Sequence, residues 1–316
     1  MQALPRAAPT SAAQPSQLQP AGDTRAPSTQ ATPDSAPRSA PSTQRPADLQ
    51  AVTDETLRHS CNSGEQSACV SLADRRKNDL KASPQDMQEM LALYQTACDR
   101  GAADGCAGLA STYQLGLGVS RDLPKALALY SQACNARSAR GCSRLGALYL
   151  AGAGVPKSAE RAIGYSQAGC DGDDALGCVN AGLMAERGDG LPREPAHARE
   201  LYEKACRLGE GAGCRQLGSL YAAGFAGEPA NPKLALIWSE KACRLKDGAG
   251  CGNAGMSYQV GFGVAANPAR AASLYKSACD YGEQRFCQLL ERFARGVKAQ
   301  ARQQPQPATP AAGQPH

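Results

Sequence analysis

Apolar and polar positions repeat along most of the chain with a period of 36 or 37 residues, and a pair of cysteines marks each period. Every period holds two runs in which apolar residues return every three or four positions, which is the spacing of a helix with one buried face. Repeats of this length, built from two helices, are typical of a solenoid in which each unit packs only on its neighbours. The pattern therefore predicts an all-α fold: an α/α solenoid, a right-handed superhelix of about six two-helix units.

The first helix of each unit begins near the second cysteine of the pair, and three positions counted from that cysteine share one helical face. Position +3 is Leu109, Leu145, Ala181, Leu217 and Ala254, and position +7 is Tyr113, Tyr149, Ala185, Tyr221 and Tyr258. Position +4 is small in these five units: Ala110, Gly146, Gly182, Gly218 and Gly255. A glycine inside a helix costs about 1 kcal/mol relative to alanine, so its recurrence indicates that a neighbouring helix comes close there.

The second helix of each unit follows a glycine turn and ends at the next cysteine. The turn reads GLGV from Gly116, GAGV from Gly152, GDGL from Gly188 and GFGV from Gly261, whereas the fifth unit carries the longer GFAGEPANP from Gly224. Glycine supplies the positive φ with which many helices end. An aromatic residue stands four or five positions before the closing cysteine: Tyr94, Tyr130, Tyr165, Tyr202, Trp238 and Tyr275. We expect these six rings to pack in the core.

Composition divides the chain into three parts. Residues 1–46 are rich in Pro, Ala, Ser, Thr and Gln, and residues 300–316 are similarly low in complexity, so we expect both segments to be disordered. Residues 47–299 form the predicted repeat domain, which a short helix over residues 47–61 opens as an N-terminal cap.

Charge and hydropathy exclude two classes of partner. Lys and Arg number 34, and Asp and Glu number 29, so the formal net charge is +5, and the two signs are mixed through the repeats. The sequence has no basic stripe with interleaved aromatic residues, so nucleic acid is not an expected partner. No apolar run approaches the ~18 residues that a membrane span requires, and no span is expected.

All 14 cysteines fall into pairs eight residues apart. The pairs are Cys61–Cys69, Cys98–Cys106, Cys134–Cys142, Cys170–Cys178, Cys206–Cys214, Cys243–Cys251 and Cys279–Cys287. A disulfide requires Cα atoms about 4.4–6.8 Å apart, whereas eight residues of one helix span about 12 Å, so the chain must turn back between two bonded cysteines. Intervening segments such as DRGAADG and RLGEGAG have the composition of turns. A disulfide within each pair, joining antiparallel helices across the turn, is the simplest connectivity, although the sequence leaves other pairings open.

Cysteine usage also bears on the compartment. Paired cysteines with none left over favour an oxidising environment, so we expect an extracytoplasmic protein, periplasmic or secreted; free thiols in a reducing cytosol are the alternative. The three histidines, His59, His197 and His316, are scattered and no CxxC is present, so neither a metal site nor a cofactor is expected. The first 50 residues show no signal-peptide pattern, so we expect a true start upstream; unconventional export or a different compartment are the alternatives.

The repeat resembles a known family. The segment CSRLGALYLAGAGVPKSAERAIGYSQAGC (Cys142–Cys170) and its copies carry the motifs LGxLY and GxGV, and KALALY (Lys125–Tyr130) is the clearest second-helix motif. These motifs resemble the Sel-1-like repeats, which are related to the tetratricopeptide repeats, over about residues 47–299. The cysteine pair in every unit is similar to that of the Helicobacter-type cysteine-rich protein (Hcp) family and of some mitochondrial intermembrane-space assembly factors. The Hcp resemblance implies either a secreted interaction module or a β-lactam-binding protein with weak β-lactamase activity.

The β-lactamase alternative needs catalytic machinery that the sequence largely lacks. A serine β-lactamase uses SxxK together with SDN-like and KTG-like elements. One SxxK exists, Ser273 to Lys276, but its Tyr275 is the repeat aromatic, so Ser273 and Lys276 are expected on the surface and are weak catalytic candidates. SDN and KTG are both missing. A β-lactam or a peptidoglycan-like small molecule is therefore the second choice of ligand, and a redox assembly factor, which would need reactive cysteines, is the third hypothesis.

A binding face is the hypothesis that the residues favour. In related solenoids the first helix of each unit lines the concave face, and position +2 on that helix is polar in four of five units: Gly108, Arg144, Asn180, Gln216 and Asn253. Amide side chains can pair with both the donor and the acceptor of a peptide backbone. The sequence thus predicts a scaffold that binds a protein or peptide through Arg144, Asn180, Gln216 and Asn253.

Overall fold

The computed structural model describes residues 46–79 and 82–292, with side chains from residue 54 onward. The leader and the tail predicted to be disordered lie outside the described residues, except for Pro46. The described part is helical and, apart from one isolated bridge between Phe225 and Glu228, contains no β-structure. A further helical stretch covers residues 284–292. The named helices are α1 (Pro46–Asn62), α2 (Gln66–Asn78), α3 (Pro84–Asp99), α4 (Ala103–Leu115), α5 (Leu123–Asn135), α6 (Ala139–Ala151), α7 (Ala159–Asp171), α8 (Ala175–Arg187), α9 (Pro195–Arg207), α10 (Gly211–Ala223), α11 (Pro232–Arg244), α12 (Gly248–Val260) and α13 (Pro268–Asp280).

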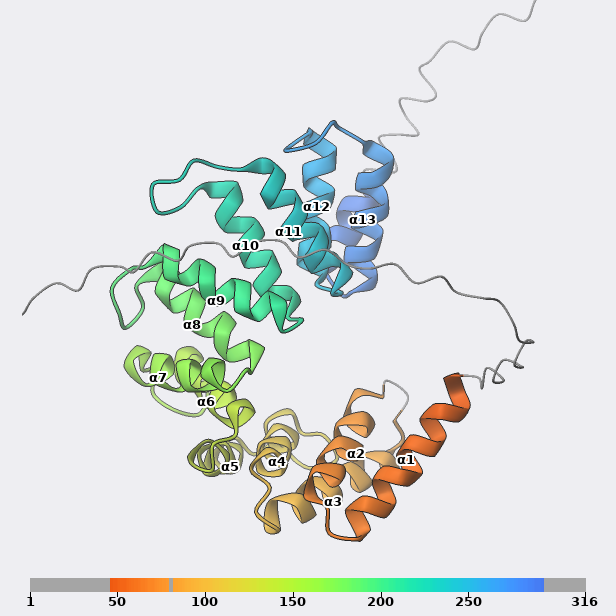
Figure 1. The fold of residues 1–316 in the computed structure, drawn as a ribbon. Helices are drawn as coiled ribbons and strands as arrows, with labels where there is room; N and C mark the ends of the chain where they lie inside the picture. The colour runs from red at the N-terminus through yellow and green to blue at the C-terminus, as the bar shows by residue number, and fades with distance from the viewer. Residues whose placement is uncertain (1–45, 80–81, 293–316) are drawn as a thin grey trace, which may run out of the picture. The chain divides into compact units, whose positions relative to one another are not determined.

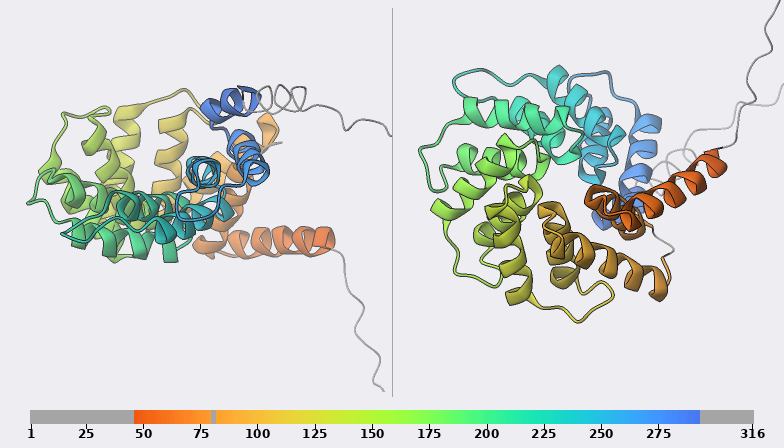
Figure 2. Two further views of the ribbon diagram at one scale, coloured as in Figure 1. Left: turned by 90° about the horizontal axis from the view of Figure 1, so that it is seen from above. Right: turned by 60° about the horizontal axis from the view of Figure 1, so that its bottom comes forward.

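The helices pack in two layers along the repeat. Each helix packs on the next in chain order, as Figures 1 and 2 show. The even-numbered helices α2 to α12 also pack directly on one another, and within the described residues the odd-numbered helices α3 to α13 make no comparable contacts among themselves. We call the even-numbered set the inner helices and the odd-numbered set the outer helices. The predicted α/α solenoid is confirmed, and the first helix of each predicted unit is an inner helix.

Local sequence explains where the helices begin and end. The outer helices α3, α5, α7, α11 and α13 start at side-chain caps, as when Asn267 Oδ1 accepts a hydrogen bond from Arg270 N at 3.0 Å, whereas α9 has no such cap. Inner helices end at a glycine in the left-handed region, at Gly116, Gly152, Gly188 and Gly261. In the fifth unit Gly224 keeps a positive φ of 78° but an extended ψ of 150°, so the chain leaves α10 in another direction and the longer predicted loop follows.

Four of the six aromatic residues that were expected in the core are fully buried. Tyr94, Tyr130, Tyr202 and Tyr275 have no exposed surface. Tyr165 and Trp238 are only partly buried and pack against the edge of the core, so the expectation that all six rings lie in the core holds in full for four of them. The buried tyrosines stand four residues before the cysteine, whereas Tyr165 and Trp238 stand five before it. One residue turns a helix by about 100°, so the buried place is taken in these two units by Ser166 and Ser239.

A disulfide joins the two cysteines of each pair, eight residues apart, with Cα–Cα distances of 4.4–4.8 Å. No cysteine is free in the described residues, which include all 14. From Cys98–Cys106 to Cys243–Cys251, each bond spans the turn between an outer helix and the next inner helix, and so holds successive helix pairs together. Cys279–Cys287 joins α13 to the helical stretch 284–292 in the same way.

Candidate functional site

The +2 positions of the inner helices differ in accessibility. Arg144 is exposed, and Gln216 and Asn253 are half-buried. Asn180 has only 7% of its surface exposed and its Nδ2 has no hydrogen-bond partner, so the prediction of an accessible amide does not hold there. Gly108 is buried because the ring of Tyr94 packs directly against its Cα. Three of the four predicted binding side chains therefore reach the surface of the inner helices.

A polar groove of about 720 Å³ crosses the inner helices α2, α4 and α6. Arg140 on α6 donates two hydrogen bonds to Asp74 on α2, at 3.0 and 2.9 Å, across 66 residues of sequence. Tyr94 Oη donates to Asp74 Oδ1 at 2.5 Å, and burial followed by this hydrogen bond raises the pKa of Tyr94. Ser138 Oγ donates to Asp104 Oδ1, also at 2.5 Å. The groove thus presents charged groups that are already paired within the protein.

Lys77 on the inner helix α2 is a second cationic residue near Arg144. Lys77 Nζ donates to Ser111 Oγ at 2.7 Å. Burial, and then the positive charge of the nearby Arg144, lower the pKa of Lys77. Arg144 itself makes no ion pair within the described residues, so its charge is available to an acidic ligand.

An apolar pocket of about 480 Å³ lies between α10, α11 and α12. Its lining includes Gly218, Ala222, Ser239, Met256 and Val260, with Asn253 from the predicted binding row. Met256 and Val260 are 42% and 72% exposed, respectively. The sequence analysis missed this pocket, although the one-residue shift of the aromatic from position 239 to Trp238 was a signal that could have revealed it.

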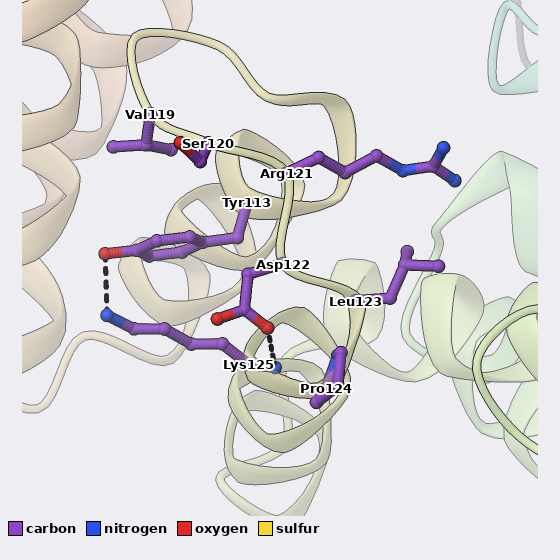
Figure 3. A pocket seen from close by; sticks show the side chains of 8 residues that line it. All are labelled: Tyr113, Val119, Ser120, Arg121, Asp122, Leu123, Pro124 and Lys125. Carbon is purple, nitrogen blue, oxygen red and sulfur yellow. Dashed lines mark hydrogen bonds between the residues drawn. The ribbon is translucent and has the colours of Figure 1, made fainter.

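An open pocket of about 580 Å³ lies beside the loop between α4 and α5, as Figure 3 shows. Lys125 Nζ donates to Tyr113 Oη at 2.7 Å and lies 4.0 Å from the centre of that ring. Asp122 Oδ1 accepts from Lys125 N at 2.9 Å and caps α5. Similar tyrosine–arginine contacts recur in other units, at Tyr149 with Arg161 and at Tyr258 with Arg270. The arrangement is therefore a structural element of the repeat.

The two weak catalytic candidates both lie on the exposed side of α13. Ser273 Oγ donates to Arg270 O at 2.8 Å. Lys276 Nζ donates to Asp280 Oδ2 at 2.7 Å. The structure places no hydrogen bond between Ser273 and Lys276, so they do not form the nucleophile–base pair that acyl transfer needs.

The described residues show neither a metal-ligand cluster nor a membrane-spanning helix. Among the residues that the structure describes, no group of three or more His, Cys, Asp or Glu side chains is placed to hold a metal ion. None of the described helices is both long and apolar enough to cross a membrane.

The two-layer stack of disulfide-joined helix pairs defines the class of protein as a helical-repeat solenoid. The family model for the Sel1 repeat matches residues 103–138, 139–174, 175–210, 211–247 and 249–282. The chain belongs to the Sel1 repeat family.

Two solved structures with TM-scores above 0.5 show the same fold. The chain is similar to a protective antigen of uropathogenic Escherichia coli (c5321) with an SLR fold, at 24% identity and a TM-score of 0.58 over 78% of this chain and 52% of that one. It thus spans about half the length of that protein. A Sel1 repeat protein from Oxalobacter formigenes aligns at 22% identity with a TM-score of 0.56, over 72% of this chain and 99% of that one. Helicobacter pylori cysteine rich protein B shares 29% identity, over 42% of this chain and 96% of that one, with a TM-score of 0.34. No curated protein sequence matches the chain.

Proposed function

We propose that this Sel1 repeat protein is a scaffold outside the cytoplasm that binds an extended protein segment along its inner helices. The observation that supports this most directly is the row formed by Arg144, Gln216 and Asn253, which occupies the same position on three inner helices and reaches the surface in each. Equivalent positions recur on the inner helices, so an extended ligand that runs across them would meet the exposed members of the row on α6, α10 and α12 in turn. Asn253 has no side-chain hydrogen bond within the described residues and can pair with a peptide backbone.

The binding role can be tested with peptides selected against the whole protein. A phage-displayed random peptide library provides the probe, and the affinities of the selected peptides are measured by fluorescence anisotropy. The double variant Arg144→Ala with Asn253→Ala should weaken these peptides at least about tenfold, and the melting temperature should stay the same because neither side chain carries a hydrogen bond within the fold.

Gln132→Ala, on the exposed surface of the outer helix α5, is the matched control and should leave affinity unchanged. Failure to select any peptide, or equal losses in the double variant and the control, would reject the inner helices as a binding face.

The proposed location rests on the disulfides, because such bonds persist in oxidising compartments. Intact mass of the protein from its native cells, alkylated before reduction, gives a direct test. Seven disulfides predict a mass that is short by 14 hydrogens and no alkylation. Alkylation of the thiols would instead place the protein in a reducing compartment.

A further inference from the structure

The apolar pocket between α10, α11 and α12 borders the position at which other units hold a tyrosine ring. In those units the ring packs against the glycine at position +4 of the inner helix: a Cβ at Gly182 would lie 2.6 Å from Cε1 of Tyr202, and one at Gly255 would lie 2.6 Å from Cε1 of Tyr275. The equivalent glycine of the fifth unit is Gly218, and the equivalent of the tyrosine is Ser239. Both residues line the pocket. A Cβ at Gly218 would lie 2.8 Å from Ser239 Oγ and 3.1 Å from Ala235 O, so α11 approaches the glycine directly and the pocket opens beside this contact.

The third unit also replaces the tyrosine with a serine, but larger residues surround it. Position +8 of its inner helix is Leu150, where the fifth unit has Ala222. Position +6 of the following inner helix is the fully buried Met184, where the next unit along from the pocket has Ser257. Small residues at both places leave the fifth unit open.

The pocket offers apolar contacts and almost no hydrogen bonds. The hydroxyls of its three serines all donate to carbonyls of their own helices: Ser219 to Arg215 O at 3.2 Å, Ser239 to Ala235 O at 2.8 Å, and Ser257 to Asn253 O at 3.1 Å. In three tyrosine-containing units the phenol donates to the residue at +8, as Tyr130 does to Gln114 Oε1 at 2.8 Å. The fifth unit has Ala222 there, which cannot accept. The walls therefore fit a phenyl ring better than a phenol.

The charge of the inner helices indicates which residues would flank such a ring in a ligand. Arg144 and Arg187 are exposed on the inner helices α6 and α8, and neither makes an ion pair within the described residues. The chain's own ends do not suit this surface. Residues 1–45 hold four Arg, two Asp and no Phe, Tyr or Trp, and residues 293–316 hold three Lys or Arg, no Asp or Glu and one aromatic residue, Phe293. An acidic partner complements the arginines, whereas these basic segments do not.

We propose that the pocket accepts one phenylalanine side chain from an extended, acidic segment of a partner protein, while the amide of Asn253 at the pocket pairs with the backbone of that segment. The proposal rests on the peptide-binding function proposed above and specifies its ligand. Buried apolar anchors in a pocket, rather than the whole contact area, carry most of the affinity of such complexes. The arginines of α6 and α8 then fix the direction of the segment.

The test fills the pocket from within the protein. Ser239→Tyr combined with Ala222→Gln reproduces the tyrosine–glutamine pair of Tyr130 and Gln114, and should weaken the library-selected peptides at least about tenfold. A second variant that fills the pocket is Ala222→Leu, which introduces the residue that the third unit has at the equivalent position, Leu150. Because Ala222 is exposed, this variant does not require a new ring to be buried. Ile237→Tyr, on the 53% exposed side of α11, adds the same ring outside the pocket and should leave affinity unchanged.

The selected peptides should share a phenylalanine among aspartates or glutamates, and replacing that phenylalanine by alanine should weaken binding to the same extent as filling the pocket. Peptides that bind the wild type and both filling variants equally would overturn the pocket while leaving the binding function intact. Selected peptides that lack a phenylalanine or an acidic residue would also overturn the assignment. Failure to select any peptide would reject both proposals together.

Discussion

At the residue scale, the contact between a tyrosine and a glycine joins neighbouring helices of one unit. Tyr202 has no exposed surface, and its Oη donates to Glu186 Oε2 at 2.7 Å after the ring passes over Gly182. The glycine is thus needed for close approach, and its helix-weakening effect is offset by the burial of a large ring.

Two glycine substitutions separate packing from helix propensity. Gly182→Ala should lower the free energy of unfolding by about 1–3 kcal/mol, because its Cβ would overlap the ring of Tyr202. Gly164→Ala, on α7, should raise it by about 1 kcal/mol, since no atom lies within 4 Å of the added Cβ and alanine favours the helix. Urea denaturation of both variants checks the prediction, and a loss of stability in both would contradict it.

The buried tyrosines make stability sensitive to alkaline pH. Burial, and then hydrogen bonds to Asp74 and Glu186, raise the pKa values of Tyr94 and Tyr202. Below the ordinary tyrosine pKa of about 10 the phenol is neutral in both states, so the stability from neutral burial is present in full. Above that pH the unfolded chain loses protons that the folded chain keeps, and stability falls by about 1.4 kcal/mol per pH unit for each such tyrosine.

Urea unfolding between about pH 8 and pH 11.5 measures this slope. Tyr202→Phe removes one ionisable group and should make the decline shallower than in the wild type. An identical slope in the variant would show that Tyr202 does not contribute.

At the element scale, the disulfide and the turn that it spans act as one joint between helix pairs. Cys206 ends the buried face of α9 and Cys214 lies in α10, and the bond closes a short ring around the turn. Each bond limits the unfolded chain only locally, so its contribution falls on the two helices that it joins and on their neighbours.

Removing one joint should have a local effect. Cys206→Ala with Cys214→Ala is expected to cost about 2–3 kcal/mol. Because a solenoid has only nearest-neighbour interfaces, faster amide exchange should concentrate in α9, α10 and α11 while α4 and α5 stay protected. Hydrogen exchange read by mass spectrometry gives the map, and a uniform loss of protection along all units would show long-range cooperativity instead.

At the scale of the whole molecule, the repeat made the architecture predictable. Cysteine spacing, the small residue at +4 and the glycine turns recur at the same positions in successive units, so a misreading of one unit is corrected by comparison with the others. The helix pairs and the close contacts at +4 could therefore be predicted from the sequence. Side-chain accessibility did not follow. Asn180 occupies the same position as Asn253 but is buried, because accessibility depends on what the neighbouring helices place against it. The pocket at Ser239 escaped prediction for the same reason, since small residues on neighbouring helices, Ala222 and Ser257, leave it open.

The placement of the disulfides also determines how the protein would respond to a pulling force. Each disulfide prevents the extension of only about eight residues. Unfolding one unit of 36 residues with its disulfide intact therefore releases about 28 residues, or about 100 Å of contour length. The glycine turns between the helices of a unit carry no cross-link and remain free to extend. Under force, the oxidised chain can therefore unfold one helix pair at a time. Reduction of the disulfides adds about eight residues of extensible chain to each unit.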